Sequence, residues 1–398
     1  MYFVAGHIPP RGAIKFYEVM WMNMIENRLA GPGLLLLMGA LLLWPQQMQQ
    51  AAWDALCLCG RTVVPALLPF LLLSSLLIRC GAATRLAGSL TPLTRLLFRL
   101  PSWSAVPFLL GMVCGYPVGA MAIAQLYEQG RCSKQAAERM LPFCNNAGPA
   151  FVIGSVGAGM LGNPTLGWML YGAHVLAAIL TGVILSCFIP AQEERIVPPP
   201  EPQPLMLAFI QAVEESAIKM LRICALIVFF AVLIRMVQLS GLCSLLCGIL
   251  AHFLPWIPLS ALQSMLLGSL EMTTGIAGCT ALGADPVRLL LAEMMLSFGG
   301  LCVLCQVASV VCPLGLSLRP YLIGKVLTCG LSALILYVAL SVQPALLSTF
   351  CFSAPTIFYI HPLVTAAVLL LLFLCMALVL CVPYLILRED CNQHRPRC

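Results

Sequence analysis

Residues 102–127 read SWSAVPFLLGMVCGYPVGAMAIAQLY, an apolar run that is interrupted in its middle by GYPVG, residues 115–119. A second interruption, FCNNAGP, follows at residues 143–149 inside the next apolar run. Polar backbone rich in Gly and Pro is tolerated at membrane depth only where it is buried in protein or lines a water-filled cavity. Paired discontinuous segments of this kind indicate the substrate site of a secondary transporter. The stretch therefore predicts a membrane transporter whose site lies at these breaks.

The composition places most of the chain in a lipid bilayer. Of the 398 residues, 61% are hydrophobic and 9% are charged, whereas about a quarter of residues are charged in soluble proteins. Uncharged stretches long enough for a crossing helix of about 20 residues take up most of the length. We therefore expect an all-α polytopic membrane protein. The net charge of +6 is interpreted as a sign of cytoplasmic loops, not of nucleic-acid binding.

Neither catalysis nor metal binding is indicated. The 20 cysteines show no second pair or histidine pair at zinc-ligand spacing, so we interpret them as small packing residues. The sequence carries no nucleophile elbow, Walker A, HExxH or kinase motif. We expect a protein that is not an enzyme and has no cofactor and no metal site. A coupling ion, H⁺ or Na⁺, is compatible with this expectation but is not identified by the residues.

The chain divides into five segments around a Pro-rich polar linker, PAQEERIVPPPEPQP, whose composition is typical of a stiff, extended spacer. The five segments are residues 1–61, an N-terminal tail with a first transmembrane helix (29–44) and a connector; 62–189, a first repeat; 190–204, the cytoplasmic linker; 205–320, a second repeat; and 321–398, C-terminal transmembrane helices, one of them at 363–387, and a basic tail.

The two repeats resemble each other weakly in sequence. LLIR at residues 76–79 matches VLIR at residues 232–235, and Tyr116 falls opposite Glu271. The second half then has its own broken hairpin, SMLLGSLEMTTGIAGC, and its own following helix, expected at residues 297–312. Counting the crossings between matched segments gives them opposite directions. The sequence therefore predicts two inverted-topology repeats, each with a re-entrant helical hairpin and a broken transmembrane helix.

The distribution of basic residues predicts that both termini are cytoplasmic. Most Lys and Arg side chains fall in segments that this topology places inside, including a loop with Arg131, Lys134 and Arg139, and Lys325 at the inner end of the crossing expected at residues 322–340. The exceptions lie outside or at the outer end of a crossing: Arg61, Arg235 and Arg288.

The breaks supply the first group of candidate substrate-binding residues. GYPVG combines a missing amide donor with two glycines that can adopt positive φ, and a helix restarting at Val118 would offer its positive end to an anion. A structural kink without a ligand is the alternative. Asn145 and Asn146 are costly against lipid, so they face a cavity or bond a neighbouring helix. In the second half Gly299-Gly300 stands in place of Cys144-Asn145, so we expect an asymmetric site.

Glu271, next to Thr273 and Thr274, is the strongest single candidate. A carboxylate inside the membrane is functional by default, either for proton or Na⁺ coupling or as a hydrogen-bond acceptor for substrate; a position at the outer surface is the alternative. The complete set of candidate substrate-binding residues is Tyr116, Pro117, Gly119, Asn145, Asn146, Glu271, Thr273, Thr274 and Ser297. We add Gln306 as a minor lining residue, interpret His174 and His252 as packing residues, and favour snorkelling over anion attraction for Arg79 and Arg235.

With GYPVGA, FCNNAGP, LEMTTGI and its two related halves, the chain resembles the sporulation integral membrane protein YlbJ (SpoVV) family of endospore-forming bacteria. That family carries the nucleoside-recognition, or Gate, domain and is distantly similar to concentrative nucleoside transporters. The resemblance implies transport of dipicolinic acid from the mother cell toward the forespore, in the outer forespore membrane. It carries over to the candidate residues of both hairpins and to the two asparagines.

Several functions stay open at the level of sequence. The leading hypothesis is alternating-access transport of a small organic anion. The alternatives are a nucleoside or other metabolite transporter of the Gate type, a Gate-type regulator that needs a partner subunit, and a membrane scaffold that recruits spore-envelope proteins through its loops and linker. The expected partners are the anionic substrate and the lipid bilayer, with no nucleic acid; a homo-oligomer is an option that the sequence leaves open.

Overall fold

The computed structural model describes residues 31–342, apart from residues 33, 36, 83–87, 89, 189–202, 254, 256 and 281–285, and also residue 370. All regular elements in these ranges are helical. The N-terminal tail, nearly all of the Pro-rich linker, the expected helix at 363–387 and the basic C-terminal tail lie outside the described residues.

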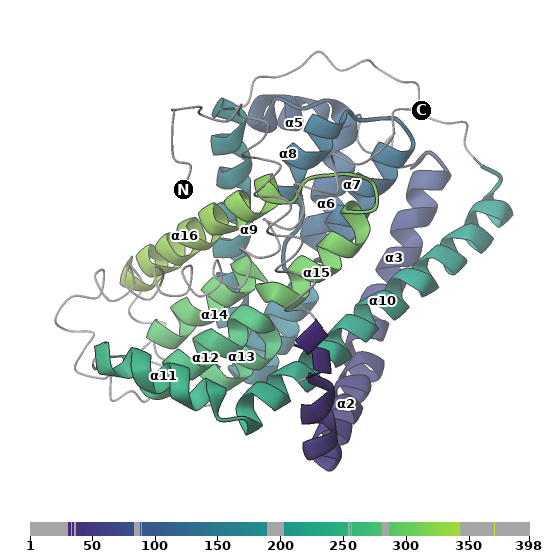
Figure 1. The fold of residues 1–398 in the computed structure, drawn as a ribbon. Helices are drawn as coiled ribbons and strands as arrows, with labels where there is room; N and C mark the ends of the chain where they lie inside the picture. The colour runs from purple at the N-terminus through teal and green to yellow at the C-terminus, as the bar shows by residue number, and fades with distance from the viewer. Residues whose placement is uncertain are drawn as a thin grey trace, which may run out of the picture.

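Along the chain, the helices form two sets, one before and one after residues 189–202 (Figure 1). The first set is α2 (Pro45–Leu58), η1 (Cys59–Val63), α3 (Val64–Arg79), α5 (Thr91–Phe98), η2 (Ser102–Ser104), α6 (Ala105–Cys114), α7 (Val118–Glu128), α8 (Lys134–Cys144), η3 (Ala150–Met160) and α9 (Pro164–Phe188). The second set is α10 (Leu205–Leu239), α11 (Leu242–Phe253), α12 (Leu259–Leu270), α13 (Met272–Thr280), α14 (Pro286–Phe298), α15 (Gly300–Val311) and α16 (Arg319–Val342).

By length and composition, four segments are long and apolar enough to cross a membrane: α9, α10, the α14–α15 segment Pro286–Val311, and α16. This finding confirms an all-helical membrane protein. The order of elements is also the same in both halves. The first half runs in the order α3, α5, α6, α7, α8, η3 and α9, and the second half runs from α10 to α16. Each half thus holds one short helical pair and then a helix that breaks and restarts.

The first helical pair, α6 and α7, is closed by direct backbone contact. Gly111 and Gly119 lie opposite each other, and the carbonyl oxygen of Cys144 at the end of α8 lies against both. A Cβ at Gly119 would fall 1.6 Å from that oxygen, and one at Gly111 would fall 1.7 Å from it. The turn between the helices needs Gly115, whose φ is +81°. Only glycine lets these three segments approach so closely.

The second pair, α12 and α13, is closed in the same way. A Cβ at Gly275 would fall 2.3 Å from the Cα atom of Gly268, and the side chain of Met295 on α14 lies against both glycines. The chain breaks at Glu271, as the sequence predicts, because Glu271 has extended backbone angles between α12 and α13. Both hairpins thus carry a facing glycine pair with a residue of the following helix packed on it.

Several sequence expectations are wrong in detail. The basic segment after the first hairpin is not a loop: Lys134 and Arg139 belong to α8, and the buried guanidinium of Arg139 donates to the carbonyl of Phe98. Lys325, expected at the inner end of a crossing, lies within α16 with a fully buried side chain. The helix expected at residues 297–312 corresponds to α15, Gly300–Val311, but the expectation misses α14, which precedes it in the same apolar segment and is separated from it by the break at Gly299.

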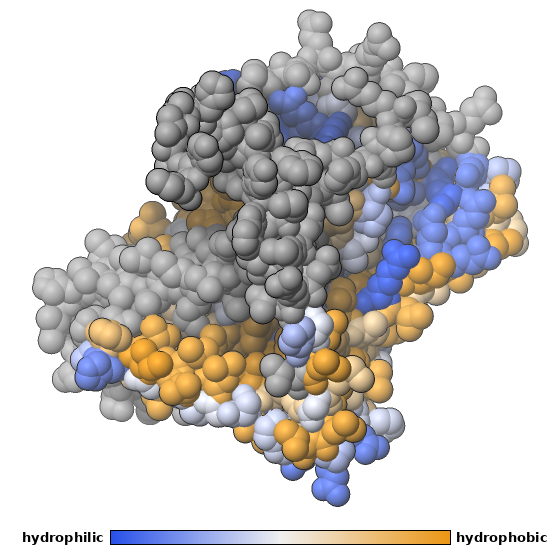
Figure 2. Space-filling model, viewed as in Figure 1, coloured by the Kyte–Doolittle hydropathy of each residue, from blue (hydrophilic) through white to orange (hydrophobic). Residues whose placement is uncertain are grey.

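A separate layer, formed by α2, α3 and α10, lies beside the hairpin-bearing helices (Figure 1). At one end of this layer Arg79 on α3 forms an ion pair with Glu215 on α10, and Ser75 donates to the same carboxylate at 3.2 Å. In Figure 2 hydrophilic residues gather at this end, and apolar side chains cover the lower part of the molecule over α11 and α2. Arg79 is therefore engaged between two helices and does not face a substrate site.

The glycine contacts give a stability prediction. Gly119→Ala should lower the free energy of unfolding by about 3 kcal/mol, because its Cβ meets a backbone oxygen that cannot rotate away. Gly172→Ala on α9, where a Cβ meets nothing within 4 Å, is the matched control and should melt like the parent protein. Thermal melting of the purified protein in detergent measures both; equal melting of the two variants would show that the contact is not rigid.

Candidate functional site

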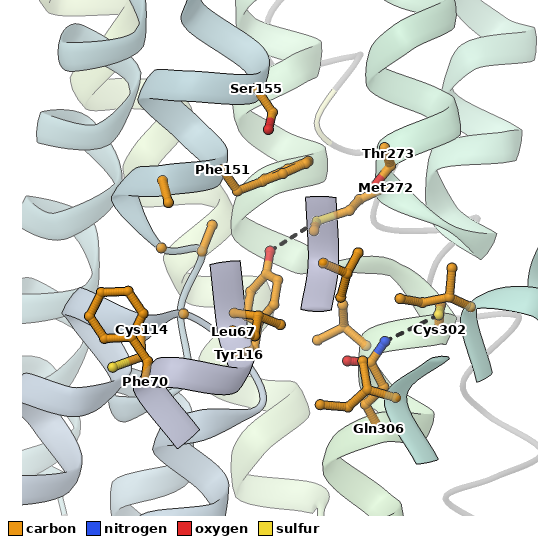
Figure 3. A pocket seen from close by; sticks show the side chains of 18 of the residues that line it. Leu67, Phe70, Cys114, Tyr116, Phe151, Ser155, Met272, Thr273, Cys302 and Gln306 are labelled. Carbon is orange, nitrogen blue, oxygen red and sulfur yellow. Dashed lines mark hydrogen bonds between the residues drawn. The ribbon is translucent and has the colours of Figure 1, made fainter. Parts of the chain in front are cut away.

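A cavity of about 170 Å³ lies between the tips of the two hairpins, where the sequence predicts one. Tyr116 from the first hairpin and Glu271 and Met272 from the second line it, and residues of α3 and α10, among them Leu67 and Phe70 on α3, complete the wall (Figure 3). Its lining residues are Val63, Leu67, Phe70, Val113, Cys114, Gly115, Tyr116, Ala147, Gly148, Ala150, Phe151, Ser155, Ile223, Ile227, Glu271, Met272, Thr273, Cys302, Val303 and Gln306. Both halves of the chain therefore build one mostly apolar pocket.

Four helices begin at the cavity. In the first half α7 begins at Val118, two residues after Tyr116, and η3 begins at the lining residue Ala150. In the second half α13 begins at the lining residue Met272, and α15 begins at Gly300, two residues before the lining residue Cys302. A helix N-terminus carries unpaired amide groups and about half a unit of positive charge. Helix ends of this kind favour negative charge beside them.

Glu271 caps one of these helices. Its carboxylate accepts the amide protons of Thr273 and Thr274 at 2.9 and 2.8 Å, and the hydroxyl of Thr274 donates to it at 2.9 Å. The carboxylate thus neutralises the N-terminus of α13. Glu271 therefore lines the cavity and does not lie on the outer surface. It is the acidic residue among the lining residues, so the other three helix ends have no acidic lining residue beside them.

Tyr116 joins the first hairpin to the second half. Its hydroxyl donates to the carbonyl oxygen of Leu296 at 2.7 Å and lies 3.0 Å from the sulfur of Met272. The ammonium nitrogen of Lys325 lies 5.6 Å from the centre of the Tyr116 ring and 5.7 Å from that of Tyr321. The ring thus separates the cavity from a buried cation, an arrangement in which the cation and the aromatic face attract each other.

The two asparagines lie behind the cavity wall and do not line it. The side-chain amide of Asn145 donates to the hydroxyl of Tyr321 at 3.3 Å, and the backbone carbonyl of Asn145 accepts from Lys325. The side-chain amide of Asn146 donates to the backbone carbonyl of Phe143 at 2.7 Å. The side-chain oxygens of both asparagines have no hydrogen-bond partner among the described residues. Their amide groups hold the α8–η3 break together, which is the helix-bonding alternative.

Of the other candidates, Thr273 and Gln306 line the cavity, whereas Pro117, Gly119, Thr274 and Ser297 do not. Gly119 instead closes the hairpin, and Thr274 completes the cap. Ser297 belongs to a fully buried polar cluster with His174, Glu293 and Ser332. His174 is therefore a hydrogen-bonded residue, beyond the packing role expected for it, while His252 is exposed at the end of α11 beside Phe253.

Sequence reasoning missed Glu293 and Lys325. Both are charged residues inside otherwise apolar segments, LLLAEMML and YLIGKVLT, so the rule that marks Glu271 marks them as well. Lys325 is instead counted with Arg319 among the residues on the inner side of the membrane. Glu293 lies near the middle of α14, a helix that begins at Pro286 and that the sequence expectation misses.

The cap at Glu271 yields a second prediction. Glu271→Ala should lower the free energy of unfolding by about 1–2 kcal/mol, because two amide groups at the start of α13 lose their acceptor. Glu271→Asp keeps a capping carboxylate and should recover most of the loss, as followed by thermal melting. Thr274→Val, which removes only the hydroxyl bond, is the matched control. Melting of Glu271→Ala at the parent temperature would contradict a stabilising cap.

Comparisons with known proteins agree with the motifs. Residues 61–189 match the family described as nucleoside recognition (Gate); this range includes the first hairpin, the two asparagines and His174. The chain is 27% identical over 333 residues to the sporulation integral membrane protein YlbJ of Bacillus subtilis (strain 168), covering 77% of this chain and 81% of the relative. No solved structure matches the chain. The chain is thus a homologue of that sporulation membrane protein and carries a nucleoside-recognition (Gate) domain in its first half, the resemblance that its motifs predict.

Proposed function

We propose that the protein transports a small organic anion through the cavity between the two hairpins, and that the anion is dipicolinate, moved from the mother cell toward the forespore. The observation that carries this proposal is the cavity at which four helix N-termini begin, backed by a buried lysine. Transport across a membrane is also consistent with the four candidate spans and with the sporulation homologue.

The size of the cavity favours a single-ring substrate. An apolar cavity of about 150 Å³ accommodates one benzene ring, and this cavity measures about 170 Å³. Dipicolinate is a pyridine ring with two carboxylates, so the size of its ring agrees with this volume, and the helix ends offer amide groups for its carboxylates. A nucleoside has a base and a ribose and would need a wider cavity than this one.

The charges around the cavity favour an anion. Positive potential comes from the starts of α7, η3 and α15 and from the ammonium group of Lys325 behind the Tyr116 ring. A low-dielectric, mostly apolar wall strengthens such interactions relative to water. The carboxylate of Glu271 is already satisfied by the start of α13, so its repulsion of a second anion is reduced.

The arrangement of helices suits alternating access. We take the two halves as inverted repeats and the hairpins α6–α7 and α12–α13 as re-entrant, so that their tips meet at mid-membrane depth. The hairpin-bearing helices would then move against the layer of α2, α3 and α10, which closes the cavity on one side. In this topology both termini are cytoplasmic and the protein resides in the outer forespore membrane.

A neutral nucleoside is the second candidate substrate. Two observations favour it: the Gate match, and the presence of Glu271 and Gln306 in the cavity. The Glu271 carboxylate can accept hydrogen bonds from a base, and the Gln306 amide can both donate to a base and accept from it. The two candidates differ in charge, so removal of the buried cation distinguishes them.

Lys325→Met is the variant that makes this distinction. It should weaken dipicolinate binding at least tenfold, equivalent to about 1.4 kcal/mol, and leave binding of a neutral nucleoside unchanged. Isothermal titration with each ligand measures the effect, and Arg319→Gln, an exposed cation at the start of the same helix, is the matched control. Equal dipicolinate affinity in Lys325→Met and the parent would contradict the proposal that the buried cation selects an anionic substrate.

Blocking the cavity tests transport itself. Ser155→Phe places a ring into the cavity from η3 and should abolish dipicolinate uptake into proteoliposomes. Ala158→Phe puts the same ring on the exposed side of the same helix and should leave uptake intact. A scaffold without transport would show no uptake even in the parent protein, and uptake by Ser155→Phe at the parent rate would exclude this cavity as the pathway.

A further inference from the structure

A fully buried polar cluster joins the two halves next to the cavity. His174 on α9 lies with its Nδ1 atom 3.3 Å from Oε1 of Glu293 and 3.1 Å from the hydroxyl of Ser297, both on α14. Ser297 also donates to Glu293 at 2.9 Å and lies 2.6 Å from the hydroxyl of Ser332 on α16. The side chains of His174 and Glu293 have no exposed surface. The cavity itself does not contain any of these four groups.

The backbone fixes the protonation state of His174. Its Nε2 atom accepts the amide proton of Ala147 at 3.1 Å, so this nitrogen carries a lone pair and the ring is neutral with its proton on Nδ1. That proton points at Glu293 and Ser297. A second proton on Nε2 would break the bond to Ala147, a residue of the cavity wall. While this bond exists, any extra proton in the cluster must reside on Glu293.

Glu293 has an unused position for that proton. Its Oε1 atom receives the bonds from His174 and Ser297, whereas its Oε2 atom is buried and has no hydrogen-bond partner among the described residues. An ionised carboxylate with one bare oxygen in the protein interior is costly. Protonation at Oε2 removes the charge and leaves both bonds to Oε1 in place.

We propose that Glu293 is the proton-binding site that couples anion transport to a proton gradient, with His174 as the positioning residue that links it to the cavity wall. The inference rests on the proposed function. When the proton is absent, Glu293 carries a negative charge two hydrogen bonds from Ala147 and opposes an anion in the cavity. When the proton is bound, that opposition disappears. Proton and anion binding then favour each other reciprocally, as in a symporter.

The other titratable groups around His174 do not replace Glu293 in this role. η3 has no titratable residue, and α5 contributes the exposed Arg95. On α8, Arg139 bonds Phe98, Glu138 bonds Ser317 and Lys134, and Cys144 is buried. Arg288 is the other charged group on α14. The groups on the remaining neighbours are Tyr171 on α9 itself, Lys325, Cys329 and Tyr321 on α16, and Tyr116.

Lys325 is a fully buried cation on α16, a helix that packs against both α9 and α14. Its ammonium group donates to the carbonyl of Asn145 and lies over the rings of Tyr116 and Tyr321. In the part of the chain that the structure describes, Lys325 forms no ion pair with Glu293, whose ion-pair partner is His174. The bare oxygen of Glu293 is therefore left for a proton.

The first test needs no substrate. Infrared difference spectra of the purified protein in liposomes, recorded along a pH series, should show the carbonyl band of a buried carboxylic acid that disappears as the pH rises. The band should be missing in Glu293→Gln and present in Glu128→Gln, an exposed carboxylate that serves as the control. His174→Gln should retain the band and shift its titration. Absence of such a band in the parent protein would overturn the proton site.

The second test measures coupling. Titration of the parent protein with dipicolinate in two buffers of different ionisation enthalpy should show uptake of one proton per anion, and affinity should fall about tenfold as Glu293 loses its proton. Glu293→Gln, which imitates the protonated carboxyl, should bind dipicolinate independently of pH and catalyse exchange, but not accumulate it along a proton gradient.

The outcomes separate the two proposals. Dipicolinate binding without proton uptake, in the parent protein, would overturn the coupling role of Glu293 and leave anion transport intact. No dipicolinate binding at all would overturn the proposed substrate, and the infrared titration would then decide the proton site by itself. Because the parent protein gives both readouts, failure of Glu293→Gln to fold would not prevent the test.

Discussion

Backbone contact at paired glycines is the constraint on which the cavity depends. Two helices can turn back on each other inside a protein only if the backbone segments at the turn pack closely. Gly111 and Gly119 achieve this in the first half by packing against the carbonyl of Cys144, and Gly268 and Gly275 do so in the second half against Met295. These contacts fix each hairpin tip relative to the helix that follows it. The cavity lies between the two tips held in this way, beside the breaks between α8 and η3 and between α14 and α15.

Much of this architecture can be predicted from the sequence, because helix breaks have strong local signals. Gly115 and Pro117 mark the first tip, and the chain does break there. The weak match between the halves places Glu271 at the second tip, where α12 and α13 part. Element boundaries farther from the breaks are predicted less well. Nothing local shows that α10 runs unbroken over 35 residues, since its polar first half and apolar second half read as two elements.

The candidate site is predictable only for residues whose position follows from a break. Tyr116, Glu271 and Thr273 line the cavity because they are at tips. The roles of Asn145 and Asn146 depend on which neighbour their side chains meet, and those neighbours, Tyr321 and Phe143, are decided by tertiary packing. Periodicity and composition do not report such contacts. For the same reason the link from Glu293 through His174 to Ala147 spans residues that no local pattern connects.

The buried charged groups are difficult to explain by stability. A buried charge pair is on balance no better for stability than apolar residues of the same volume, and a bare carboxylate oxygen in the interior is worse. Yet Glu293 and Lys325 are both fully buried, on two adjacent helices of the second half, and each is bonded to the α8–η3 break or the helix behind it in the first half. Leucine in either position would make a simpler core. Glu293 on α14 is linked to the cavity wall through His174, and Lys325 on α16 is linked to the break beside it through Asn145. This placement is better explained by control of the electric potential in the cavity than by the folding of the surrounding helices.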